Sequence, residues 1–100
     1  MNLKGTVALV TGGNGGLGQR LCHALAREGA HIAVVYAQSQ DRAETVAWEL
    51  AVEHGVEAEA FACDITDQVA VERLVADVSA RFGRLDILVN DATYNKAIPF

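Results

Sequence analysis

The chain has 100 residues, of which 51% are hydrophobic, and it carries a formal net charge of −5 at pH 7. This length allows one domain at most, and the apolar content is sufficient for a buried core. Because the net charge is negative and the lysines and arginines are not clustered, the sequence argues against nucleic acid or an anionic membrane surface as a partner.

Short apolar runs alternate with helical patterns along the chain. In chain order, the apolar runs cover residues 6–10, 31–36, 56–63 and 85–90. The helical patterns between them cover residues 16–28, a second stretch capped by Asp41 or Ser39 that runs to about residue 54, and a third capped by Thr66 or Asp67 that runs to residue 82. A glycine follows each helical pattern, as is typical of helix C-termini. The alternation predicts βαβ units and an α/β fold, with helices on both faces of a parallel sheet.

Each helical pattern places apolar side chains on one face, and we expect that face to be buried against the sheet. The expected inward side chains are Leu17, Leu21, Ala24 and Leu25 in the first helix, Ala43, Val46, Ala47 and Leu50 in the second, and Val71, Leu74, Val75, Val78 and Phe82 in the third. Each of the four apolar runs is expected to be a buried strand.

The turn between the first strand and the first helix is rich in glycine. It reads TGGNGGLG over residues 11–18. A helix N-terminus has unpaired amides and a partial positive charge, and glycines allow a phosphate to come close to the backbone. Because the loop lies between a strand and a helix, the sequence predicts a site for a phosphate, and for a pyrophosphate in particular.

The glycine loop does not select a family by itself. The patterns G-x-G-x-x-G, T-G-x-x-G-x-x-G and T-G-x-x-x-G-x-G all fit it, because each uses a different set of glycines. The phosphate-binding loop of nucleoside triphosphatases is excluded, since Gly18 is followed by Gln19 and Arg20 rather than by Lys and Ser or Thr.

The end of the second strand bears on the choice of dinucleotide. An acidic residue there usually binds the ribose 2′-hydroxyl of NAD, but residues 35–39 read VYAQS and are neutral. Hydroxyl and amide donors, with Arg42 one helical turn further on, could receive a 2′-phosphate. We therefore predict NADP as the cofactor, with NAD as the alternative.

The histidines and cysteines give no signal of a metal site or a disulfide framework. His23, His31 and His54 lack metal-ligand spacing, so we predict no metal. Cys22 and Cys63 form no CxxC motif, and we expect both to be buried apolar residues of a cytoplasmic protein.

Three blocks together resemble the short-chain dehydrogenase/reductase family. They are the glycine loop in its T-G-x-x-x-G-x-G form, CDIT at residues 63–66, and DILVNDAT at residues 86–93, which is similar to the family's D-x-L-V-N-N-A-G. The resemblance implies a three-layer α/β/α Rossmann-type fold with strand order 3-2-1-4, truncated after strand 4. The segment VVYA and the neutral turn after it look most like the 3-oxoacyl-carrier-protein reductase branch.

The resemblance also implies roles for individual residues. Asp64 would bind the adenine amino group, although it could equally cap the third helix. Ile65 would pack on the adenine ring, Asn90 would brace the sheet through backbone hydrogen bonds, and Ala92 would lie against the cofactor ribose. The complete set of expected cofactor-binding residues is Gly12, Asn14, Gly15, Gly16, Leu17, Gly18, Tyr36, Ala37, Gln38, Asp64, Ile65, Asn90 and Ala92.

The sequence departs from the family pattern in two places and lacks the family's catalytic motif. Asp91 stands where the pattern has a second Asn, and Thr93 where it has Gly, which puts the cofactor contacts of residues 91–93 in doubt. The family's Tyr and Lys lie four residues apart, but Tyr36 is followed by Gln40 and Tyr94 by Ile98 at that spacing. We therefore assign no catalytic residue to residues 1–100.

The expected function is hydride transfer between NADP(H) and a carbonyl or alcohol substrate, with residues 1–100 forming the cofactor-binding part of a Rossmann domain. We expect a fragment of a longer chain, or a chain that pairs through its fourth strand, and a homo-oligomer. The alternatives are a non-catalytic dinucleotide-binding or scaffold module and an interaction domain without a ligand. No nucleic acid or membrane partner is expected.

Overall fold

The computed structural model describes residues 2–92. Strands and helices alternate through this range, as predicted, and their boundaries lie within two residues of the expected ones. They are β1 (Val7–Thr11), α1 (Gly16–Arg27), β2 (His31–Tyr36), α2 (Gln40–His54), β3 (Ala58–Ala62), α3 (Gln68–Phe82) and β4 (Ile87–Asn90).

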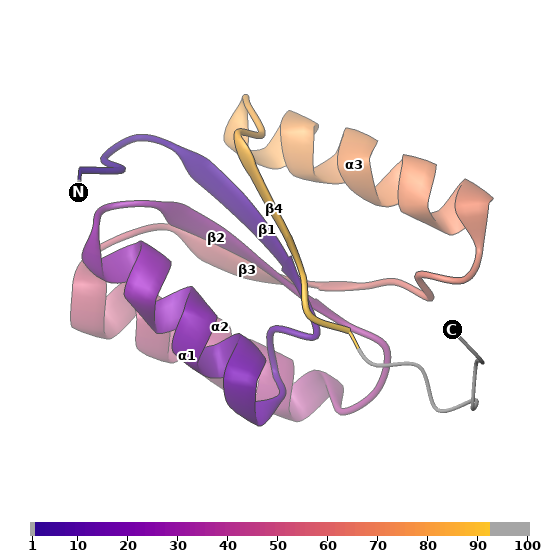
Figure 1. Cartoon of the computed structure of the whole chain (residues 1–100), viewed down its shortest axis with the longest axis horizontal. Helices are drawn as coiled ribbons and strands as arrows, with labels where there is room; N and C mark the ends of the chain where they lie inside the picture. Colours follow the sequence, from indigo (N-terminus) through magenta and orange to yellow (C-terminus); the bar gives the residue numbers. More distant parts are fainter. Residues whose placement is uncertain (1, 93–100) are drawn as a thin grey trace, which may run out of the picture.

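The strands form one parallel sheet between two layers of helices. The strand order is β3-β2-β1-β4, and the central strand β1 pairs with both β2 and β4. Helices α1 and α2 cover one face of the sheet, and α3 covers the other (Figure 1). This arrangement confirms the predicted three-layer Rossmann-type fold and its strand order.

Strand β1 is buried along its whole length because its side chains alternate between two cores. Ala8 and Val10 contribute to the core under α1 and α2, whereas Val7 and Leu9 contribute to the core under α3. The unbroken apolar run in the sequence is therefore the expected pattern for a strand with helices on both faces.

The predicted inner faces of the helices are only partly correct. The prediction for α2 is confirmed, since Ala43, Val46, Ala47 and Leu50 are its buried residues. In α3, Leu74 and Val78 are buried, Val71 and Phe82 are half-buried, and Val75 is exposed.

The prediction for α1 is only partly correct, because Leu25 packs against the core and Leu21 is half-buried, but the helix turns a different face to the sheet. Its buried residues are Gly18, Cys22 and Ala26, while Leu17 is 57% exposed and Ala24 is also exposed. Gly18 packs directly against the backbone of Gly12. This close backbone contact, rather than the apolar stripe, sets the rotation of the helix.

Both cysteines are buried, as predicted. Burial, together with the negative charge of Asp91, raises the pKa of the Cys22 thiol to about 12. Cys22 is therefore a packing residue rather than a nucleophile at neutral pH.

Strand β4 is less buried than the sequence predicts. Its residues alternate between half-buried and exposed, and Leu88 is 68% exposed. Within residues 2–92, β1 is the neighbour with which β4 pairs, so β4 forms the edge of this sheet.

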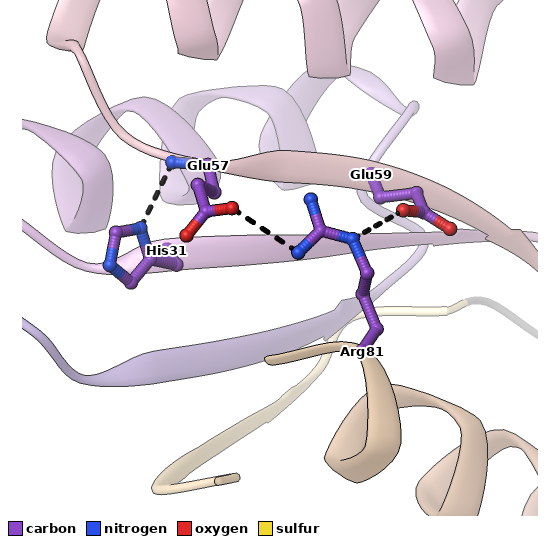
Figure 2. A network of polar contacts seen from close by, with 4 residues as sticks. All are labelled: His31, Glu57, Glu59 and Arg81. Atoms are coloured by element: carbon purple, nitrogen blue, oxygen red, sulfur yellow. Dashed lines mark hydrogen bonds and ion pairs between the residues drawn. The ribbon is translucent and has the colours of Figure 1, made fainter. Parts of the chain in front are cut away.

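A polar network fastens α3 to the amino end of the sheet. Arg81 donates through Nε to Glu59 at 2.8 Å and through a terminal nitrogen to Glu57 at 3.3 Å (Figure 2). The Glu57 amide donates to His31 Nδ1 at 2.9 Å.

A second polar group lies at the start of β1. Asp86 accepts from the Val7 amide and from Arg84. The polar groups at this end of the sheet thus bind one another, and the candidate site lies at the opposite end.

No helix in residues 2–92 has the length and apolar character needed to cross a membrane.

Candidate cofactor site

The turn between β1 and α1 is held in shape by close backbone packing. Gly12 has φ +69°, and a Cβ at this position would lie 3.1 Å from the backbone of Ala92. A Cβ at Gly18 would lie 2.7 Å from the carbonyl carbon of Gly12 and closer still to its oxygen. A Cβ at Gly13 would crowd Val34 and the carbonyl of Val10. These three glycines are therefore required by the fold itself.

Gly15 and Gly16 differ from the other glycines of the loop because space is available beside them. A Cβ on Gly16 would meet no atom within 4 Å, and one on Gly15 would make ordinary contact at 3.4 Å with Gly12. Gly15 is the N-cap residue of α1 and provides no side-chain hydrogen bond to the first turn. The start of α1 thus presents a bare backbone to the adjoining space, as a phosphate site requires.

That space is a pocket of about 710 Å³ at the carboxyl end of the sheet. The structure brings most of the predicted site residues together around it. They are Gly12, Asn14, Gly15, Gly16, Leu17, Tyr36, Ala37, Gln38, Asp64, Ile65 and Ala92, joined by Val35, Ser39, Arg42, Cys63, Thr66 and Asp91.

Two predicted site residues do not line this pocket. Gly18 lies behind it, against Gly12, and so shapes the loop from inside. Asn90 accepts a hydrogen bond from the Thr11 hydroxyl at 2.8 Å and lines a smaller neighbouring cavity of about 200 Å³. Its side chain does link β1 to β4, but its hydrogen-bond partner is a side chain rather than the expected backbone.

The turn from β2 to α2 forms the second wall of the pocket. Asn14 Nδ2 donates to the Gln38 carbonyl at 2.9 Å and so connects the glycine loop to this turn. Ser39 has φ +65°, a conformation that is costly for a residue other than glycine and that this connection helps to hold. Arg42, one helical turn further on, brings a positive charge to this wall.

Asp64 and the start of α3 form the third wall. Asp64 Oδ1 accepts from both the amide and the hydroxyl of Thr66, at 2.9 and 2.7 Å, and these hydrogen bonds hold the pKa of the exposed Asp64 carboxyl below its usual value. Asp64 does not cap α3, because Asp67 accepts from the Val69 and Ala70 amides. Asp64 lines the pocket, and its second carboxylate oxygen is not used by Thr66.

Thr11 is a structural centre of the site that the sequence analysis did not single out. Its hydroxyl donates to Asn90 and accepts from the amides of Asp91 and Ala92, at 3.1 and 3.3 Å. These contacts hold the chain that leaves β4 against the glycine loop. The signal in the sequence was the Thr that opens the T-G-x-x-x-G-x-G pattern.

Of the two residues that depart from the family pattern, Asp91 lines the pocket, and Thr93 lies outside the described residues.

Comparison with known proteins identifies the family. The family model described as short chain dehydrogenase matches residues 6–100. The chain therefore belongs to the short-chain dehydrogenase/reductase family, as its motifs predicted, and the relatives it matches are oxidoreductases.

Individual relatives agree with this assignment. The chain is 40% identical over 85 residues to the 3-oxoacyl-[acyl-carrier-protein] reductase of Staphylococcus aureus, which covers 85% of this chain and 34% of the relative. A short-chain dehydrogenase from Burkholderia cenocepacia in complex with NADP superposes with a TM-score of 0.90 at 41% identity, covering 97% of this chain and 39% of that one. An NAD+-bound xylitol dehydrogenase superposes with a TM-score of 0.87 at 36% identity. The superposition covers 94% of this chain and 35% of the dehydrogenase chain.

The chain spans about a third of the length of the relatives it matches. Its structural neighbours include complexes with NADP or NADPH and one with NAD+, at similar structural agreement. A nicotinamide dinucleotide is thus the cofactor class of these structural neighbours.

Proposed function

We propose that residues 1–100 form the cofactor-binding part of an oxidoreductase that transfers hydride between NADP(H) and a carbonyl or alcohol substrate. The observation that supports this most directly is the bare start of α1, where Gly15 and Gly16 face a pocket of about 710 Å³ with room beside them. The backbone amides of the first turn would hold the pyrophosphate, and the bound dinucleotide would supply hydride transfer.

Other residues of the pocket suit the adenine and a ribose of the cofactor. Asp64 keeps one carboxylate oxygen for an amino group while Thr66 holds the other. Ile65 provides an apolar surface beside it for the adenine ring, and Ala92, which lies against the backbone of Gly12, would contact the cofactor ribose. The proposed cofactor contacts are those of the predicted set that line the pocket, while Gly18 and Asn90 support them from behind.

The test of the phosphate site is the substitution Gly16→Leu, followed by titration of NADPH fluorescence. Because the added side chain would project into open space, we expect the free energy of unfolding to be unchanged or to rise by up to about 1 kcal/mol. NADPH affinity should fall at least about tenfold, which corresponds to about 1.4 kcal/mol. Ala24→Leu, which adds the same side chain at an exposed position of α1 away from the pocket, is the control. Equal affinity in Gly16→Leu and wild type would remove the basis of this site.

We propose NADP rather than NAD because the end of β2 is neutral and Arg42 lines the same wall. Arg42→Ala should weaken NADPH binding by about tenfold, the value of one charge-assisted hydrogen bond, and leave NADH binding nearly unchanged. Arg73→Ala, which removes an exposed arginine of α3, is the matched control. Equal losses for NADPH and NADH in Arg42→Ala would assign Arg42 to another part of the nucleotide.

Catalysis in this proposal uses an acid–base Tyr and its Lys from outside residues 1–100, since neither tyrosine of the sequence has a Lys four residues later. We also propose a cytoplasmic homo-oligomer, in line with the composition and the exposed edge strand β4. A panel of carbonyl substrates with NADPH tests turnover in the full-length protein. NADPH binding without any turnover would instead favour a non-catalytic dinucleotide-binding module, and absence of binding would favour an interaction domain.

A further inference from the structure

Two histidines and a glutamate converge where α1 packs against α2. His23 comes from α1, and Glu53 and His54 are the last two residues of α2. Each offers one ligand atom, and the three atoms lie within 4.8 Å of one another. None of these residues lines the cofactor pocket. The cluster is therefore separate from the site described above, and the proposed function does not use it.

The distances between the three atoms suit a metal ion. His23 Nδ1 lies 2.9 Å from His54 Nε2, and Glu53 Oε2 lies 3.6 Å from the first and 3.9 Å from the second. A circle drawn through the three atoms has a radius of about 2.0 Å, and zinc binds histidine nitrogen and carboxylate oxygen at about 2.0–2.2 Å. An ion at the centre, or slightly above it toward a fourth ligand, would therefore contact all three atoms after small adjustments.

The carboxylate of Glu53 converges on the two rings without forming a hydrogen bond to either. At 3.6 and 3.9 Å, its distances to the ring nitrogens are too long for hydrogen bonds. The two ring nitrogens are close enough to share one proton. A cation at the centre would use the lone pairs of both rings and the charge of the carboxylate together.

The burial of the three side chains suits a metal site whose ligands are held in place and that an ion can reach from solvent. The side chains of His23 and His54 are 24% and 15% exposed, whereas that of Glu53 is 57% exposed. The two rings are thus held by the packing of α1 on α2, and the carboxylate lies on the open side. Two imidazoles and one carboxylate are a donor set typical of zinc and of neighbouring divalent transition metals.

We propose that His23, Glu53 and His54 bind one divalent transition-metal ion of the zinc type, which connects α1 to α2. This proposal departs from the expectation of no metal site, because sequence spacing cannot show that His23 lies beside the end of α2. The ion would act on the fold, by joining the two helices on one face of the sheet, and would leave the cofactor pocket unchanged.

The test is titration of the untagged chain with Zn²⁺ by calorimetry and with Co²⁺ by visible absorption. We expect one equivalent to bind saturably and the d–d bands of Co²⁺ to indicate a nitrogen and oxygen site. His23→Gln and His54→Gln should each lower the affinity by at least about tenfold, and Glu53→Gln should lower it less. His31→Gln, which alters the histidine outside the cluster, is the matched control and should bind as wild type does.

A second measurement separates loss of the site from loss of the fold. Zn²⁺ should raise the melting temperature of wild type and of His31→Gln, because an ion that binds only the folded state stabilises it. The same ion should leave the melting temperature of His23→Gln unchanged, with that variant's circular dichroism matching wild type. A folded His23→Gln that binds Zn²⁺ like wild type would overturn the proposal. So would a thiolate-to-cobalt charge-transfer band or the absence of saturable binding.

Discussion

Helices α1 and α3 both begin at the carboxyl end of the sheet, but their first turns are satisfied in different ways. At α3, the Asp67 carboxylate accepts from the amides of Val69 and Ala70, at 3.0 and 3.2 Å. At α1, the equivalent position is Gly15, which has no side chain to offer. Both N-cap residues have extended backbone conformations, with φ −102° for Asp67 and −82° for Gly15. The difference therefore lies in the side chain and not in the path of the chain.

This difference distinguishes a helix start whose first amides stabilise the fold from one whose first amides face a pocket and can bind a ligand. The protein's own carboxylate uses the first amides of α3, so they contribute to the stability of the fold. The first turn of α1 faces the pocket instead, and its partial positive charge is available to an external anion. An N-cap carboxylate placed at the start of α1 should therefore raise the free energy of unfolding and lower the affinity for an anion. Removing the carboxylate from the start of α3 should lower the free energy of unfolding alone.

The largest effect is expected from Gly18→Ala, which breaks the loop that precedes α1. A Cβ at this position would overlap with the carbonyl group of Gly12, so the backbone must move. We expect a loss of about 3 kcal/mol in the free energy of unfolding, together with loss of measurable NADPH binding. Chemical denaturation and fluorescence titration measure the two effects. Gly16→Ala, two residues earlier, is the control and should be at least as stable as wild type. A Gly18→Ala protein of normal stability would contradict the packing described here.

The next largest effect is expected from Gly15→Asp, which gives α1 the kind of N-cap that α3 has. The backbone conformation of Gly15 is one that an Asp N-cap adopts without strain. The new carboxylate should raise the stability by a few tenths of a kcal/mol. It should also lower NADPH affinity at least about tenfold, because it occupies the first amides and repels the phosphates.

Gly15→Asn separates charge from size in the same experiment. Asn caps a helix as well as Asp does but carries no charge. Its NADPH affinity should lie between those of wild type and Gly15→Asp, and added salt should narrow the gap between the two variants. Identical affinities for Gly15→Asp and wild type would show that the start of α1 does not hold an anion.

The opposite exchange, Asp67→Ala, removes the cap of α3 and should affect stability alone. We expect the free energy of unfolding to fall by about 1 kcal/mol, the usual value of such a cap. NADPH affinity should stay close to that of wild type, because Asp67 does not line the pocket. Asp67→Asn keeps an acceptor at the same place and should recover most of the stability. A large loss of affinity in a stable Asp67→Ala protein would mean that the two helix starts are coupled.

The layers and strand order could be predicted from the sequence because they follow from hydrophobic alternation and from family motifs. The inner face of α2 was predicted correctly because apolar packing alone determines it. The rotation of α1 was not, since it depends on backbone contact between Gly18 and Gly12, which no apolar pattern records. Leu88 was expected to be buried, and its side chain is exposed in residues 2–92, where β4 has a neighbouring strand on one side.

The candidate site was predictable in its residues and less so in their roles. Three glycine patterns fitted the loop, and only the structure separates the tightly packed Gly12, Gly13 and Gly18 from the open Gly15 and Gly16. The hydroxyl of Thr11 was missed because its partners come from residues about 80 positions later in the chain. The same limit applies to His23 and His54, which are 31 residues apart and in contact.

The smallest effect is expected from Asp64→Asn, which tests the turn that leads into α3. Hydrogen bonds from Thr66 lower the pKa of Asp64 in the folded protein. The ionised carboxylate therefore contributes stability that is fully present above the ordinary Asp pKa of about 3.9 and is lost as the pH falls through the lower folded value. Asp64→Asn should be less stable than wild type at neutral pH, and the difference should disappear in acid. Unfolding midpoints measured between neutral and acidic pH follow this change, and Asp77→Asn, at an exposed position of α3, is the control. A constant difference between Asp64→Asn and wild type at every pH would mean that the charge of Asp64 does not hold this turn.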